Sequence, residues 1–103
     1  MTAIQGGVMR WLPESIFGGS PAPGDVLWPE ERVTVDQMIR SYTAGVAYAN
    51  YLEGVTGSLE VGKSADMVVV DRDLTAIAPE ELGQAVVLMT MFRGEEVYRD
   101  IGF

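Results

Sequence analysis

The sequence predicts a small α+β fold, with one or two helices followed by a mainly antiparallel sheet. Apolar residues repeat at helical spacing over residues 34–52. The run Met67–Val70 contains three consecutive valines, which favour a buried strand. Residues 93–95 contain glycine and separate two β-rich runs, which predicts a hairpin between a buried strand at residues 85–92 and a returning strand at residues 96–100.

Length and charge limit what this domain can bind. The chain has 103 residues with 7 basic and 15 acidic side chains, which gives a net charge of −8 at pH 7. A chain of this length forms one domain at most. Because it has no Lys/Arg cluster to neutralise phosphates, we expect it to bind neither nucleic acid nor an anionic membrane. No apolar run approaches the roughly 18 residues of a membrane span.

The chain contains neither cysteine nor histidine. Without cysteine there are no disulfides, and we expect a cytoplasmic protein. Histidine is the commonest transition-metal ligand and the commonest general base. We therefore expect this chain to hold no catalytic residue, no cofactor-binding residue and no metal ligand.

Several clusters of charged or hydroxyl residues have structural explanations that fit better than catalytic ones. They are Glu30-Glu31, Glu80-Glu81, Asp71-Arg72-Asp73 and Ser41-Tyr42-Thr43. Glu30-Glu31 precedes a helix and is solvated, whereas Glu80-Glu81 lies at the start of one, where the helix dipole stabilises carboxylates. The third cluster is typical of a surface salt bridge, and the hydroxyls of the fourth lack a neighbouring base.

The N-terminal third is predicted to be a short helix followed by a long loop. Ile4, Val8 and Trp11 fall on one helical face, and Pro13 ends this helix. Residues 13–32 are rich in glycine and proline, which indicates a loop. Its larger apolar residues include Phe17, Val26, Leu27 and Trp28. We expect some of these to pack against the fold, because their exposure to water is unfavourable.

Residues 34–52 give the clearest helix. Thr34 and Gln37 form a capping-box pair ahead of the apolar repeat. Gly54 is expected to end the helix. Farther along the chain, Pro79 is predicted to begin a short helical turn, since proline suits the first helical position.

Residues 57–64, GSLEVGKS, match the phosphate-binding loop pattern G-x-x-x-x-G-K-[ST]. That loop has a strand before it and a helix after it, because the helix N-terminus holds the phosphates. Here a helix precedes the pattern and the strand Met67–Val70 follows it. Glu60 would also place a negative charge where phosphate binds. We therefore favour a structural turn over a nucleotide site.

The turn interpretation makes its own structural predictions. Residues 58–60 can form a short strand, and Gly62 is expected to adopt a positive φ. The carboxylate of Asp66 is expected to accept backbone N–H groups where the buried strand begins. Met89 and Met91 are two residues apart, so they share one face of their strand and are expected to fill the core.

Residues 57–71, GSLEVGKSADMVVVD, resemble the C-terminal signature of the amidohydrolase superfamily. Residues 31–35 and 42–49 are similar to amidohydrolase family 3, the branch that includes N-substituted formamide deformylases. The last hairpin, with Thr90, Gly94 and Tyr98 among its residues, is similar to the same branch. The resemblance covers nearly the whole chain.

The resemblance implies a metal-dependent (β/α)8 barrel with a small β-sandwich-like domain, which hydrolyses non-peptide carbon–nitrogen bonds through a metal-activated water. Residues 1–54 would then be the last barrel-associated helices and a long loop, and residues 55–103 part of the small β domain. No position matches a metal ligand of the family, and Lys63 matches its structural Gly-Lys turn. This C-terminal fragment alone is therefore expected to be inactive, with a divalent, zinc-type metal bound elsewhere in the full-length enzyme.

The resemblance also implies partners. In the family, the small domain uses strands from the N-terminus of the chain, so the missing barrel and N-terminal strands would pack against this fragment. Without them, open strand edges and bare apolar faces predict self-association. The alternative function is a stand-alone, self-associating interaction module without catalysis.

Overall fold

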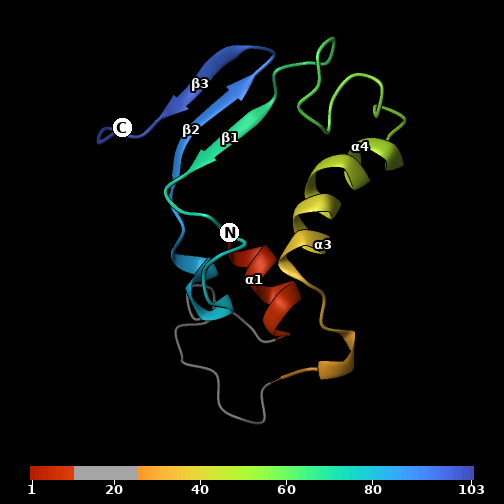
Figure 1. Cartoon of the computed structure of the whole chain (residues 1–103), viewed down its shortest axis with the longest axis vertical. Coiled ribbons are helices and arrows are strands. Elements are labelled where there is room, and N and C mark those ends of the chain that lie inside the picture. Colours follow the sequence, from red (N-terminus) through yellow and green to blue (C-terminus); the bar gives the residue numbers. More distant parts are fainter. Residues whose placement is uncertain (11–25) are drawn as a thin grey trace. The chain divides into compact units, whose positions relative to one another are not determined.

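A computed structural model describes residues 1–10 and 26–103. The described chain has the predicted α+β class, with short helical segments and a three-stranded antiparallel sheet (Figure 1). It forms two compact units: unit 1 combines residues 1–39 and 73–85, and unit 2 combines residues 40–72 and 86–103. The predicted division at residue 54 concerns the domains of a longer enzyme and stays a prediction.

Unit 1 begins with the predicted N-terminal helix, α1 (Thr2–Met9). The helix ends at Met9, where Arg10 adopts a left-handed conformation with φ of 60°, so the prediction that Pro13 ends it is wrong. Most of the predicted loop at residues 13–32 lies outside the described residues, as do Trp11 and Phe17. Its described end contains a short 3-10 helix, η1 (Pro29–Glu31). Leu27 and Trp28 are 57% and 60% exposed, whereas Val26 is half-buried, so of the described apolar residues of this loop only Val26 shows the expected packing.

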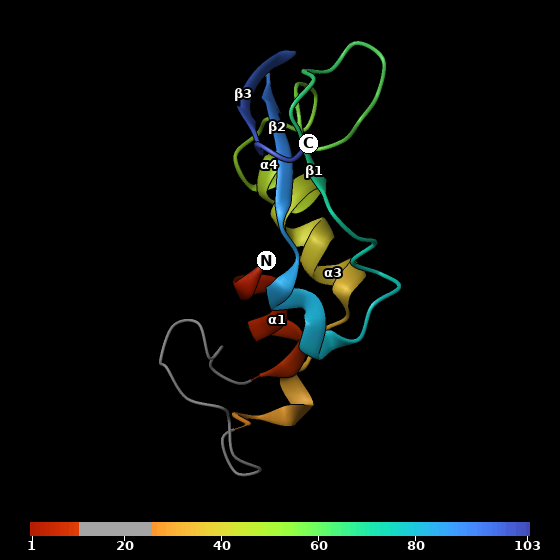
Figure 2. The ribbon, with the colours of Figure 1, turned by 90° about the vertical axis from the view of Figure 1, so that its left-hand side faces the viewer.

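The core of unit 1 lies between α1 and the predicted helical turn, which forms a 3-10 helix, η3 (Pro79–Gln84). The two elements lie side by side in both ribbon views (Figures 1 and 2). Leu82 on η3 is fully buried, and Gln5 on α1 is also buried. Nε2 of Gln5 donates to the carbonyl oxygens of Pro79 (3.2 Å) and Glu80 (2.9 Å). This buried amide therefore supplies hydrogen bonds to two carbonyl oxygens in the first turn of η3.

Replacing Gln5 by alanine is expected to lower the free energy of unfolding by about 1–3 kcal/mol, because the carbonyls of Pro79 and Glu80 lose their donor. Urea unfolding followed by tryptophan fluorescence measures the loss. A Gln5→Glu variant provides a second test, because a carboxylate cannot donate to these carbonyls at neutral pH. Two variants as stable as the unsubstituted chain would contradict the prediction.

The predicted central helix begins with the predicted capping box and contains an unpredicted π-helical segment. The Thr34 backbone N–H donates to Gln37 Oε1 (2.8 Å), and the Gln37 N–H donates to Thr34 Oγ1 (3.1 Å). The helical elements that follow are α3 (Val35–Arg40), the π-helical segment η2 (Ser41–Gly45) and α4 (Val46–Ala49).

The C-terminal end of this helical stretch was not predicted correctly. The helix ends at Ala49, three residues before the predicted end at residue 52. Nδ2 of Asn50 donates to the carbonyl of Val46 (2.8 Å), and Tyr51 takes the left-handed conformation with φ of 59°. Gly54 is therefore not the residue that ends the helix, because the chain has already turned at Tyr51.

The sheet of unit 2 has the strand order β1-β2-β3, all antiparallel. Its strands are β1 (Met67–Val70), β2 (Val87–Phe92) and β3 (Glu95–Arg99), which confirms the predicted strand and hairpin within two residues. Arg93 and Gly94 both have positive φ, as a two-residue hairpin turn requires. The pairing contains irregularities at Leu88 on β2 and at Val97 on β3.

β1 and β2 place apolar residues on both faces of the sheet, whereas β3 adds the charged residues Glu96 and Arg99 to one of them. Val68, Thr90 and Tyr98 are paired across the three strands and share one face. Val69 and Met89 are paired on the other. An ordinary antiparallel sheet with one solvated face alternates apolar and polar residues. Val68 is nevertheless 54% exposed and Tyr98 48% exposed, so the prediction that Met67–Val70 is a buried strand is wrong for this structure of the chain alone.

Candidate functional site

The phosphate-loop pattern at residues 57–64 folds as an irregular turn. Gly57 and Gly62 have φ of 91° and 93°, which confirms the predicted conformation of Gly62. Residues 58–60 form no strand, so that prediction is wrong. The next regular element is the strand β1, and no helix starts at Ser64. The helix N-terminus that would hold phosphates is therefore missing from this segment.

The amine of Lys63, which would contact phosphate in a nucleotide site, is bound within the turn. Its Nζ lies 2.8 Å from Glu60 Oε2 and donates to Ser58 Oγ at 2.8 Å. The Ser58 hydroxyl in turn donates to the Glu60 carboxylate. The hydrogen bond from Lys63 is the main reason that the pKa of Glu60 is lowered. The three side chains close the turn on itself.

Asp66 connects three separate parts of unit 2. Its Oδ1 accepts hydrogen bonds from the Arg93 backbone N–H (2.8 Å) and the Ser64 hydroxyl (2.8 Å). Its Oδ2 accepts one from the Thr56 hydroxyl (2.7 Å). The N–H of Arg93 contributes most to lowering the pKa of Asp66. The prediction that Asp66 accepts a backbone N–H at the start of the strand is confirmed, and the bond fastens β1 to the hairpin turn.

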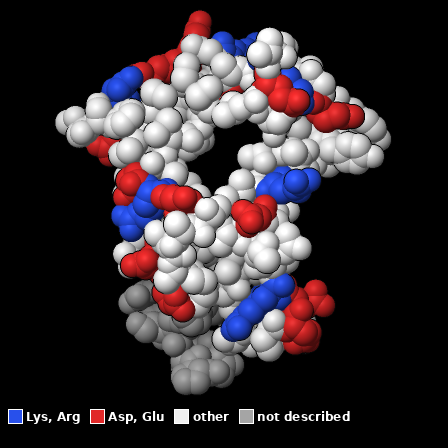
Figure 3. All heavy atoms as spheres, viewed as in Figure 1, with Lys and Arg blue, Asp and Glu red and all other residues white. Residues whose placement is uncertain are grey.

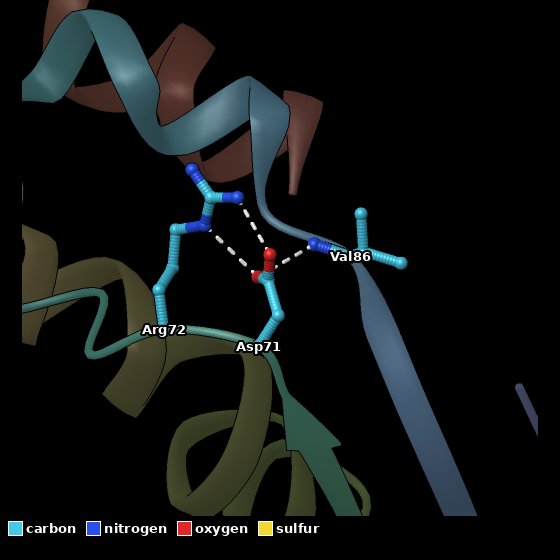
Figure 4. Close-up of polar contacts among 3 residues, drawn as sticks. All are labelled: Asp71, Arg72 and Val86. Atoms are coloured by element: carbon cyan, nitrogen blue, oxygen red, sulfur yellow. Dashed lines mark hydrogen bonds and ion pairs between the residues drawn. The ribbon is translucent and has the colours of Figure 1, made fainter. Parts of the chain in front are cut away.

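Asp71 has the corresponding role at the other end of β1 (Figure 4). Its carboxylate accepts Arg72 Nε (2.9 Å) and a second nitrogen of the same guanidinium (2.6 Å), together with the Val86 N–H (2.9 Å). The Asp71 N–H donates back to the Val86 carbonyl (3.0 Å). These bonds, chiefly those from Arg72, lower the pKa of Asp71 to about 2. The predicted salt bridge is thus formed, while Asp73 instead accepts the backbone N–H and hydroxyl of Thr75.

Unit 2 is expected to lose stability as the pH falls from about 4 to 2. The pKa of Asp71 is about 2 in the fold, whereas an unfolded aspartate has a pKa of about 3.9. At a pH above the pKa of the unfolded state, the carboxylate is ionised and its whole contribution to stability is present. Protonation removes this contribution as the pH falls through the pKa of the folded state. Melting temperatures by circular dichroism across this range measure the loss. An Asp71→Asn variant should melt lower at pH 7 and depend less on pH; an unchanged dependence would contradict the role of Asp71.

Glu81, another of the candidate carboxylates, also has a structural role. Oε2 of Glu81 accepts the Ala78 N–H (3.3 Å) at the start of η3. In residues 1–10 and 26–103, no three His, Cys, Asp or Glu side chains gather closely enough to hold a metal ion. The described residues therefore do not fit a metal, and no chemical step in this chain is assigned to one. No helix in the described part is long and apolar enough to cross a membrane.

Charged side chains of both signs lie on the face shown in Figure 3. On the face shown in Figure 3, the lysines and arginines lie as separate groups among carboxylates and form no continuous basic patch. This arrangement offers no basic surface to a nucleic-acid backbone on that face.

Sequence reasoning identified Asp66 and Asp71 but not most of their partners. Arg93 lies 27 residues beyond Asp66, and Val86 lies 15 residues beyond Asp71. Both carboxylates flank an apolar strand. This position was the signal in the sequence that they hold the ends of the strand in place. The partners themselves depend on the register of β1 against β2, which the sequence does not specify.

The chain matches one protein family and is similar to two enzymes. The model of the amidohydrolase family matches residues 1–98. The chain is 33% identical to the N-substituted formamide deformylase of Arthrobacter pascens, in a match that covers 82% of this chain and 18% of that enzyme. It is 36% identical to the imidazolonepropionase of Bdellovibrio bacteriovorus over 67% of this chain and 16% of that enzyme. The chain thus spans less than a fifth of the length of these relatives. No solved structure matches it.

Proposed function

The chain belongs to the amidohydrolase family, and we propose that it forms the C-terminal part of a metal-dependent amidohydrolase that hydrolyses non-peptide carbon–nitrogen bonds. On this proposal, the barrel and N-terminal strands of the enzyme pack against it. The zinc-type metal and its ligands lie in that remainder. The 103-residue chain alone has no hydrolase activity.

The observation that carries this proposal is the small buried core. The apolar residues that are buried in the described chain are Met9, Ala47 and Leu82. Many large apolar side chains remain exposed, including Tyr48, Leu59, Val68, Phe92 and Tyr98. Isolated exposed apolar residues are normal, but a sheet with apolar residues on both faces requires a cover on each. The exposed residues fit a surface that another part of the same enzyme covers.

The lengths of the relatives support the same proposal. The deformylase and the imidazolonepropionase each have more than four-fifths of their length outside the matched segment. That remainder is large enough to supply both a metal site and a cover for the exposed apolar surface. An N-substituted formamide is the first substrate class to test, because the match to the deformylase covers more of the chain than the match to the imidazolonepropionase.

A chimera tests the proposal. The segment of the Arthrobacter deformylase that matches this chain is replaced by this chain, and formate release from an N-substituted formamide is measured with added zinc. The chimera is expected to be soluble and to retain hydrolysis. The isolated chain is expected to release no formate under the same conditions.

A matched chimera that carries Leu82→Ala serves as the control, because it removes the buried side chain of η3 without touching any candidate ligand. It is expected to be less soluble or less active than the first chimera. A soluble first chimera without activity, or turnover by the isolated chain, would overturn the proposal.

A further inference from the structure

The helical stretch of unit 2 ends in a backbone motif that places Tyr51 where glycine is the usual residue. The Leu52 N–H donates to the carbonyl of Ala47 (2.8 Å), and the Tyr51 N–H donates to the carbonyl of Tyr48 (3.1 Å). These two bonds form a Schellman motif, in which the residue with the left-handed conformation is most often glycine. Tyr51 takes that conformation, with φ of 59°. A bulky L-residue is rare there, because its β-carbon crowds the backbone.

The contacts of Tyr51 within the described chain do not offset the cost of its backbone conformation. Its side chain is 91% exposed, so the ring buries little apolar surface there. Residues in such conformations persist where surrounding contacts compensate for the strain, and they cluster at catalytic and binding sites. The compensating contact of Tyr51 is therefore expected to come from outside the described chain.

Tyr51 belongs to an exposed apolar surface whose backbone is held in place. The exposed apolar residues beside it in the sequence are Tyr48, Leu52 and Val55. Residues 46–56 contain one charged residue, Glu53. The Schellman motif fixes one end of this segment, and the Ser64 N–H fixes the other by donating to the carbonyl of Val55 (2.8 Å). The surface is therefore ordered before a partner binds, which lowers the entropic cost of binding.

We propose that Tyr51 anchors this chain to the remainder of its own enzyme, with its ring seated between apolar side chains of that remainder. The inference rests on the proposed function and deepens it, because it names a residue through which the covering part binds. The size of the remainder selects this occupant, since more than four-fifths of each relative lies outside the matched segment. Tyrosine is also enriched among the few interface residues that carry most of the binding energy.

Opposite effects of one substitution in two proteins test this inference. In the isolated chain, Tyr51→Gly is expected to raise the melting temperature by about 2–8 °C, because glycine takes the left-handed conformation without crowding. In the deformylase chimera, the same substitution is expected to lower the melting temperature, because the contacts of the ring with the remainder are lost. Circular dichroism measures both melts.

Arg93→Gly is the matched control, because Arg93 also has a positive φ, of 54°, but carries a charged side chain. It is expected to raise the melting temperature of both the isolated chain and the chimera. A Tyr51→Gly chimera that melts no lower than the unsubstituted chimera would overturn the inference. So would equal falls in the two substituted chimeras, since the loss would then come from glycine rather than from the missing ring.

This inference and the proposed function fail separately. Melting is measured in the soluble chimera whether or not it releases formate, so a soluble, inactive chimera overturns the proposed function while its melts still decide the role of Tyr51. An active chimera whose stability does not depend on Tyr51 overturns this inference alone. An insoluble chimera also counts against it, because seating Tyr51 on the remainder should cover the exposed apolar surface.

Discussion

Replacing Leu82 by alanine is expected to lower the free energy of unfolding of unit 1 by about 2–5 kcal/mol. Leu82 is the large side chain that is fully buried in the described chain, and it lies in η3, which packs against α1. Truncation removes apolar contacts and leaves a cavity that the surrounding residues fill only in part. Because native domains are stable by only about 5–15 kcal/mol, we expect the variant to lose much of the α1–η3 packing.

Tryptophan fluorescence during urea unfolding measures this loss, since both tryptophans fall within residues 1–39. Leu27→Ala is the matched control, because Leu27 also belongs to unit 1 but is 57% exposed. Its effect is expected to stay within about 0.5 kcal/mol. Equal losses in the two variants would show that the buried position of Leu82 does not determine the stability of unit 1.

Local patterns predicted most of the regular structure. The three valines of β1, the capping box of Thr34 and Gln37, and the hairpin turn at Gly94 each act over a few residues. Their outcome therefore depends little on the rest of the fold. The π-helical segment Ser41–Gly45 had no comparable signal.

Burial was the property that the sequence predicted least well. A run of valines indicates that a strand suits a buried position, but burial also requires an element that covers it. Val68 remains 54% exposed because that face of the sheet is open in the described chain. The difference between the predicted and observed burial is the strongest physical support for a larger parent enzyme.

The candidate site was predictable only where its features depend on a few neighbouring residues. The order of elements around residues 57–64, with a strand after the pattern, is a local property and argued correctly against a phosphate loop. The contacts of Asp66 and Asp71 with Arg93 and Val86 span long stretches of sequence. They follow from strand register, which a single sequence leaves open.

Replacing Gly57 by alanine is expected to destabilise unit 2 through two separate effects. Gly57 has φ of 91°, and a left-handed conformation costs an ordinary L-residue about 1–2 kcal/mol. A β-carbon at this position would also lie 2.5 Å from the β-carbon of Ala47 and 3.2 Å from the carbonyl oxygen of Thr43. Relieving such a clash in a packed site typically costs about 1–3 kcal/mol more.

Gly62→Ala separates these two effects, because both glycines lie in residues 57–64 and have nearly the same φ. Gly62 has φ of 93°, but no neighbouring atom lies within 4 Å of an added β-carbon. It should therefore show only the cost of the conformation, and Gly57→Ala should be the less stable variant in thermal melts followed by circular dichroism. In a phosphate loop, by contrast, a β-carbon at either glycine would approach the bound phosphates. Equal melting temperatures would show that the close approach to Ala47 does not hold residues 57–64 in place, and the structural interpretation of the turn would lose its main support.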